Sequence, residues 1–288
     1  MNDIDQTSAR TAAEPGQVIV SGATGFVGRH VVPLLHAQGY RVVALGRDAD
    51  RAAALGWPAD IAFYPVDIVK HDCDFQPEAG ASLIHLAWQG LPDYRSLSHL
   101  ELNLPASCRF IRGMVERGVS NVVVAGTCLE YGMQDGALGA DTVPLPDNPY
   151  AIAKNALRQY LVCAQRTLPF SLKWGRLFYM YGAGQNPKSV LAQLDTAIAQ
   201  GDTVFRMSGG EQLRDYLPVT AVASGLVDLL RAPGDRLANI CSGTPISIRR
   251  LVEERIRARS ASITLELGHY PYPDYEPMAF WGKKQDLS

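Results

Sequence analysis

Short runs of apolar residues recur along the chain, and stretches with apolar residues at helical spacing separate them. The runs show no polar alternation, which predicts strands buried on both faces of a sheet. They lie at residues 18–20, 42–45, 61–64, 82–86, 122–125 and 171–174. Because these strands alternate with helices, the pattern predicts an α/β fold with a doubly wound parallel sheet.

The pattern is less regular beyond residue 175. Helical spacing returns at about 189–199, 219–230 and 247–257, and a strand pattern lies at 237–240. Prolines then interrupt a tail rich in aromatic residues. We therefore expect a smaller C-terminal lobe beside the sheet.

Three glycines follow the first predicted strand at a spacing of three residues. Gly22, Gly25 and Gly28 lie where the strand turns into a helix, so the backbone can turn tightly and approach a pyrophosphate closely. A plain turn before a helix would also tolerate glycines, but the strand before and the helix after favour dinucleotide binding.

The end of the second predicted strand indicates which dinucleotide is bound. NAD-binding proteins usually place an acidic residue there for the ribose hydroxyls, whereas this chain has Gly46 followed by Arg47. Gly46 leaves room for a 2′-phosphate that the guanidinium can bind with two hydrogen bonds. The pattern favours NADP, and Asp48 next to Arg47 keeps NAD as the alternative.

Tyr150 and Lys154 are four residues apart at the start of a predicted helix, so both project from one face. An ammonium beside a phenol lowers the phenol pKa, which makes it a usable acid or base near neutral pH. The pair could occur by chance in any helix, but its place after the dinucleotide-binding strands favours a catalytic role.

The chain from about Gln17 to Val252 resembles the extended short-chain dehydrogenase/reductase family, also called the nucleotide-sugar epimerase/dehydratase family. The motifs that carry the resemblance occur in family order. They are the glycine-rich turn 22–28, Val66-Asp67-Ile68, 84–87, Asn103, Thr127 with Tyr131-Gly132, Tyr150 with Lys154, Arg176-Leu177, 181–185, 214–216 and 239–243.

The resemblance implies roles for individual residues. Thr127 hydrogen-bonds the substrate oxygen, Tyr150 passes the proton, and Lys154 holds the nicotinamide ribose and tunes Tyr150. Together with Arg47, the residues expected to bind the cofactor are Gly22, Thr24, Gly25, Phe26, Val27, Gly28, Asp67, Ile68, Leu86, Ala87, Tyr150 and Lys154. The residues expected to bind the substrate are Thr127, Arg176, Gln185 and Arg214.

These motifs divide the chain. We expect a Rossmann NADP-binding domain at 17–175, to which a segment at about 213–240 returns. Residues 176–212 and 241–288 would form the substrate-binding lobe, and the polar residues 1–16 a disordered tail.

Sugar dehydratases of this family carry an Asp-Glu pair directly after the catalytic Thr, where this chain has Cys128 and Leu129. Leucine cannot act as an acid or base, which argues against dehydration, although Glu130 follows one residue later. We interpret Cys128 as a buried structural thiol.

With the preference for NADP, the sequence favours an NADPH-dependent reductase that acts at C4 of a nucleoside-diphosphate 4-keto-6-deoxy sugar, a step of deoxysugar biosynthesis. Two alternatives remain open. One is an NAD-dependent nucleotide-sugar 4-epimerase, and the other is a catalytically silent NADP-binding sensor or scaffold.

Composition narrows the partners. The 288 residues carry a net charge of −2, which offers no basic surface for nucleic acid or anionic lipid. Five scattered cysteines without a CxxC pair indicate neither a metal site nor a disulfide framework, and no apolar stretch predicts a membrane helix. We expect a cytoplasmic enzyme, and the family implies a homodimer formed through helices at about 100–117 and 150–165.

Overall fold

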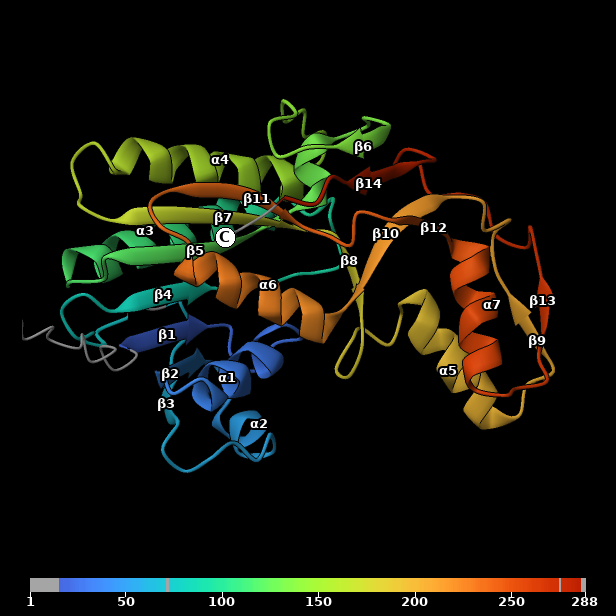
Figure 1. The fold of residues 1–288 in the computed structure, drawn as a ribbon, viewed down its shortest axis with the longest axis horizontal. Coiled ribbons are helices and arrows are strands. Elements are labelled where there is room, and N and C mark those ends of the chain that lie inside the picture. Colours follow the sequence, from blue (N-terminus) through green and yellow to red (C-terminus); the bar gives the residue numbers. More distant parts are fainter. Residues whose placement is uncertain (1–15, 71–72, 275, 286–288) are drawn as a thin grey trace, which may run out of the picture.

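The computed structural model describes residues 16–70, 73–274 and 276–285, so the tail expected at 1–16 lies outside the described residues except for Gly16. A seven-stranded sheet forms the centre of the structure (Figure 1). Its strands have the order β11-β7-β5-β4-β1-β2-β3, and every neighbouring pair is parallel. They are β1 (Gln17–Ser21), β2 (Arg41–Gly46), β3 (Ala62–Pro65), β4 (Ser82–His85), β5 (Asn121–Thr127), β7 (Ser171–Leu177) and β11 (Arg236–Ile240). The predicted doubly wound α/β fold is confirmed.

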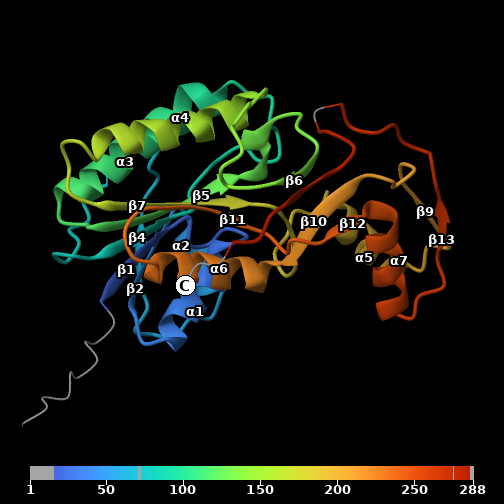
Figure 2. The ribbon, with the colours of Figure 1, turned by 45° about the horizontal axis from the view of Figure 1, so that its top comes forward.

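Helices cover both faces of this sheet (Figure 2). One face carries α1 (Gly28–Ala37) and α6 (Val219–Arg231), and α2 (Ala49–Ala53) contacts the edge strand β3. The other face carries α3 (Leu104–Glu116), which continues the π-helical turn η1 (His99–Asn103), and α4 (Pro149–Ala164). Alternate residues of one strand serve the two cores: Val18 and Val20 pack toward α1 and α6, and Ile19 toward α3 and α4. This explains why the strands read as unbroken apolar runs.

The C-terminal lobe has its own small core between α5 (Val190–Gln200) and α7 (Ile248–Ala258). Short strands surround it and link it to the main sheet. They are β8 (Tyr179–Tyr181), β10 (Leu213–Pro218) and β12 (Pro245–Ser247) in one sheet, and β9 (Val204–Arg206) with β13 (Thr264–Glu266) in another. A further pair joins β6 (Gly136–Leu138) to β14 (Phe280–Gly282). The sequence predicted the helices of this lobe but none of these strands.

The connections of the sheet place its ligand site. From β1 the chain runs outward to β2 and β3, and β4, beside β1, begins the opposite run to β5 and β7. Ligands of open α/β sheets bind at the carboxyl ends of the strands where the direction reverses. Here that point lies between β1 and β4. Within the described part of the chain, no helix has the length and apolar character needed to cross a bilayer.

Candidate active site

A cavity of about 880 Å³ extends from the carboxyl edge of the sheet into the C-terminal lobe. Of the residues predicted from the sequence, those on its wall are Gly22, Gly25, Phe26, Val27, Gly28, Leu86, Thr127, Tyr150, Lys154, Gln185 and Arg214. Those that are not on its wall are Thr24, Arg47, Asp67, Ile68, Ala87 and Arg176. The fold therefore brings the glycine turn, the three predicted catalytic residues and part of the lobe to one volume.

The glycine-rich turn follows β1 and packs against the end of β4. Gly22 has a φ of +70°, and a Cβ there would lie 2.7 Å from the backbone nitrogen of Ala87. At Gly28, the first residue of α1, a Cβ would lie 2.4 Å from the carbonyl oxygen of Gly22. No side chain caps the amino end of α1, where the N–H groups of Arg29 and Val31 donate to the carbonyl oxygens of Gly25 and Val27. This cradle fits a pyrophosphate.

The end of β2 has the character that the sequence indicated. Gly46 is buried, and a Cβ there would lie 3.2 Å from the Phe63 ring, while Arg47 is exposed. The carboxylate of Asp48 accepts a hydrogen bond from the backbone N–H of Arg51 at 2.9 Å and so caps α2. Asp67 accepts from Val69 N–H and from the Gln89 side chain, each at 3.1 Å.

Tyr150 and Lys154 lie in the first turns of α4. The Asn148 side chain caps this helix by accepting from Ala151 N–H at 3.0 Å. The Lys154 ammonium donates to the carbonyl oxygen of Ala125 in β5 at 2.9 Å and lies 3.9 Å from the centre of the Trp88 ring. Both side chains are buried.

Aromatic rings surround the Tyr150 phenol. Their centres lie 5.9 Å away for Trp88, 5.5 Å for Tyr94 and 5.3 Å for His99. This aromatic cage could not be predicted from the sequence, because its members come from the loop after β4 and from η1, and no spacing signal links either segment to α4. The only available hint was the aromatic density between residues 88 and 99.

The protonation states differ from the expectation that Lys154 lowers the Tyr150 pKa. Burial raises the pKa of Tyr150 well above its usual value, and interaction with the Thr127 side chain opposes this rise only in part. Burial also lowers the pKa of Lys154 to about 7. The expectation is wrong for this structure, because the aromatic cage removes water from the phenol while the ammonium is directed to Ala125 and Trp88.

Thr127 ends β5, and the 3-10 turn η2 (Cys128–Tyr131) follows. Its hydroxyl oxygen accepts a hydrogen bond from Leu129 N–H at 3.2 Å. Two residues before it on the same strand, Ala125 binds Lys154. The end of β5 thus contains Thr127 and anchors Lys154, which are two of the three predicted catalytic residues.

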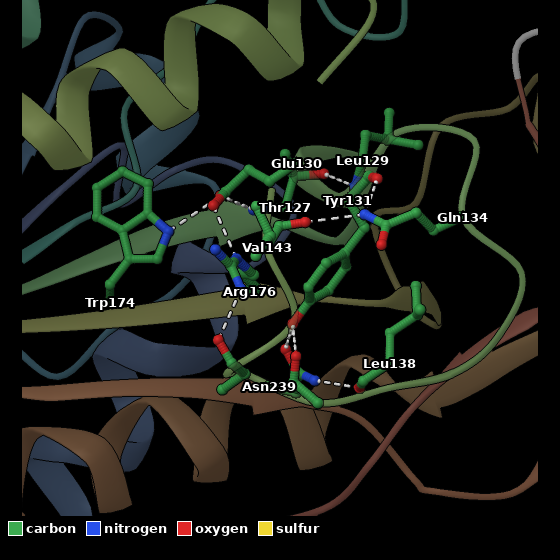
Figure 3. Close-up of polar contacts among 12 residues, drawn as sticks. Thr127, Leu129, Glu130, Tyr131, Gln134, Leu138, Val143, Trp174, Arg176 and Asn239 are labelled. Atoms are coloured by element: carbon green, nitrogen blue, oxygen red, sulfur yellow. Dashed lines mark hydrogen bonds and ion pairs between the residues drawn. The ribbon is translucent and has the colours of Figure 1, made fainter. Parts of the chain in front are cut away.

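Arg176 does not face the cavity. It is fully buried behind β5, where its Nε donates to the Glu130 carboxylate at 2.8 Å and its Nη1 to the Ala140 carbonyl at 3.1 Å (Figure 3). The structure therefore places Arg176 away from the cavity, where its guanidinium forms an ion pair with Glu130 of η2.

Arg214 does line the cavity, but its charge is also paired. Its Nη2 donates to the Glu276 carboxylate at 2.9 Å, and its Nη1 to the Leu213 carbonyl at 2.9 Å. Neighbouring Asp215 instead accepts from the backbone N–H groups of Ser242 and Gly243. Gln185 lies on the wall, and its side chain accepts from Gly182 N–H at 3.3 Å.

Cys128 and the C-terminal tail also reach the cavity. Burial raises the pKa of the Cys128 thiol far above its usual value, which favours the protonated form of this group. In the tail, Tyr270 and Glu276 line the cavity, while Phe280 lies in β14 and packs against Phe178. Among the described residues, no group of three His, Cys, Asp or Glu side chains could hold a metal ion.

Comparisons with known proteins agree with this geometry. Residues 18–241 match the model of the NAD dependent epimerase/dehydratase family. The chain belongs to this family. It is an NAD(P)-dependent oxidoreductase of the short-chain dehydrogenase/reductase type, as the motifs from the glycine turn to Tyr150 and Lys154 predicted.

Two curated relatives and one solved structure are similar to this family member over most of its length. It is 31% identical to a dTDP-6-deoxy-L-talose 4-dehydrogenase (NAD(+)) of Aggregatibacter actinomycetemcomitans, over 93% of this chain and 99% of the relative. It is 29% identical to a dTDP-6-deoxy-L-talose 4-dehydrogenase (NAD(P)(+)) of Kitasatospora kifunensis, over 93% and 86%. The structure of MoeE5 in complex with UDP-glucose and NAD has a TM-score of 0.77 at 27% identity, covering 94% of this chain and 91% of that one.

Proposed function

We propose that this enzyme reduces a nucleoside-diphosphate 4-keto-6-deoxy sugar at C4, with NADPH as the hydride donor. The observation that carries the proposal is the convergence of Thr127, Tyr150 and Lys154 on the cavity that the glycine turn also lines. The two talose 4-dehydrogenases support a reaction at C4 of a 6-deoxy sugar, and the bound UDP-glucose of MoeE5 supports a nucleotide-sugar substrate.

The chemistry of the site supports reduction. The nicotinamide ring supplies the hydride when the cofactor is bound. Reduction of a ketone also requires a proton for the oxygen, and Tyr150 presents a phenol, protonated at neutral pH, on the cavity wall. Thr127, at the end of β5, would hold the same oxygen, and Lys154, on the same cavity wall, would hold the nicotinamide ribose.

The preference for NADPH rests on the end of β2. Arg47 is exposed there, and among the described residues its guanidinium forms no hydrogen bond or ion pair. The one carboxylate beside it, Asp48, already caps α2 and is less available to ribose hydroxyls. The relatives use NAD(+) or NAD(P)(+), so the pocket of this chain decides the preference.

The test is turnover of dTDP-4-keto-6-deoxy sugars, followed by the loss of reduced-nicotinamide absorbance, with NADPH and NADH side by side. We expect NADPH consumption, and Tyr150→Phe should lower kcat by ~10²- to 10⁴-fold while cofactor binding remains. The proposal fails if no cofactor is consumed and the purified protein instead retains NAD and converts an ordinary nucleotide sugar into its 4-epimer.

A further inference from the structure

Glu130 of η2 and Arg176 of β7 form a buried ion pair beside the carboxyl end of β5. The Glu130 carboxylate is fully buried and receives three hydrogen bonds (Figure 3). The donors are Thr127 N–H at 2.9 Å, the Trp174 indole N–H at 2.9 Å and Arg176 Nε at 2.8 Å. Neither Glu130 nor Arg176 touches the cavity, so direct contact with the substrate does not explain them.

The surrounding backbone is shaped around this carboxylate. A Cβ at Gly126 would lie 2.2 Å from the Trp174 indole nitrogen and 2.5 Å from Glu130 Oε1, so only glycine leaves room for their hydrogen bond. Gly126 of β5 lies opposite Arg176 of β7 in the sheet. Trp174 and Arg176 lie on the same face of β7 because they are two residues apart. The far side of the guanidinium is held by the Ala140 carbonyl and stacks on the Tyr131 ring at 4.5 Å.

We propose that Glu130, held in place by Arg176, is a positioning residue that fixes the Thr127 backbone and favours the protonated form of Lys154. The inference rests on the proposed function, in which Thr127 and Tyr150 handle the substrate oxygen. The Glu130 carboxylate accepts from the backbone N–H of Thr127, and the Thr127 hydroxyl oxygen accepts from Leu129 N–H. These two hydrogen bonds form a capping box that includes the predicted catalytic threonine.

The same carboxylate acts on Lys154. This ammonium is anchored to Ala125, two residues before Thr127 on β5, and burial opposes its charge. The negative charge of Glu130 favours the protonated form and so offsets part of the effect of burial on the Lys154 pKa. One buried group thereby binds the backbone of Thr127 and favours the charged form of Lys154.

Variants at Glu130 distinguish its effects on Thr127 and Lys154 from a general contribution to the stability of the fold. Glu130→Gln keeps an oxygen for Thr127 N–H and Trp174 but removes the charge. Because it leaves the Arg176 guanidinium buried and unpaired, the double variant Glu130→Gln/Arg176→Gln serves as the second test, with no unpaired charge remaining. The control is Asp195→Asn, which breaks the partly buried Asp195–Arg255 pair between α5 and α7, away from the cavity.

We expect both Glu130 variants to lower kcat by ~10- to 100-fold at neutral pH, with substrate KM and cofactor affinity near those of the wild type. Asp195→Asn should lower the unfolding midpoint and leave kcat unchanged. The ionisation of Lys154, followed by NMR of 13C-lysine-labelled protein and assigned with Lys154→Met, should move to lower pH in both Glu130 variants.

The outcomes are separable. If the double variant keeps the wild-type kcat and the wild-type Lys154 titration, the ion pair is only structural and the inference is wrong. If the Lys154 titration moves but no 4-keto sugar is reduced by the wild type, the electrostatic part of the inference stands and the proposed function fails. If kcat falls in step with the unfolding midpoint in the control as well, the positioning role is refuted.

Discussion

Burial of Lys154 should make the stability of the cofactor-free protein depend on pH in a definite direction. The folded chain lowers the pKa of this group from 10.5 to about 7, whereas the unfolded chain returns it to its ordinary value. Between these two pH values the unfolded state binds a proton that the folded state lacks, so stability rises with pH. The slope from this group approaches ~1.4 kcal/mol per pH unit.

Lys154→Met removes the ammonium and retains a chain of similar length. Below a pH of about 7 the wild type bears the full cost of the buried charge, on the order of 5 kcal/mol. The variant loses the hydrogen bond to Ala125, which costs roughly 1 kcal/mol. We therefore expect the inactive variant to be more stable than the wild type by several kcal/mol at neutral pH, with the difference vanishing as the pH approaches 10.

The assay is urea unfolding of both proteins between pH 7 and 9.5 without cofactor. The difference between them isolates Lys154, because all other titrating groups are shared. Lys70→Met, at an exposed site, is the matched control and should follow the wild type at every pH. A constant difference between Lys154→Met and the wild type across this range would refute the reasoning.

Two further predictions concern the cofactor site. Arg47→Ala should raise the KM for NADPH by ~10- to 100-fold with little change for NADH, because one charge-assisted contact to the 2′-phosphate is lost; equal effects on both cofactors in steady-state kinetics would remove the basis for an NADPH preference. Gly28→Ala should abolish cofactor binding in a fluorescence titration and lower the unfolding free energy by ~1–3 kcal/mol, since the added Cβ meets the backbone of Gly22 and Ala23 at 2.4 to 2.7 Å. Unchanged binding there would show that the turn does not need close packing.

The sequence predicted the main sheet because its strands are buried on both faces and leave a strong apolar signal. The strands of the C-terminal lobe were harder to predict. Strands of three residues such as β8, β9 and β12 are too short for any periodicity, and partners distant in the sequence define them. The joining of β6 to β14 links residues 136 and 280, a contact that local propensity cannot indicate.

The part of the candidate site that could be predicted is the part that follows from the order of the strands along the chain. Thr127, Tyr150 and Lys154 follow strands whose ends meet at one edge, so their convergence followed from topology. Their protonation states did not, because burial of Tyr150 depends on Trp88, Tyr94 and His99 from other segments. Desolvation is a property of the assembled site, and no motif spacing contains it.

Arg176 and Arg214 show why the role of a charged residue needs the structure. Both looked like substrate ligands in the sequence, and both proved to be paired with glutamates, 46 and 62 residues away along the chain. The difference between them is access. The Glu130–Arg176 pair is closed on every side, so exchange of its carboxylate for a ligand would leave Glu130 buried and uncompensated. The Arg214–Glu276 pair lies on the cavity wall, where both side chains can be reached from the cavity. The same residue type therefore supports the catalytic strand in one case and remains a candidate substrate ligand in the other.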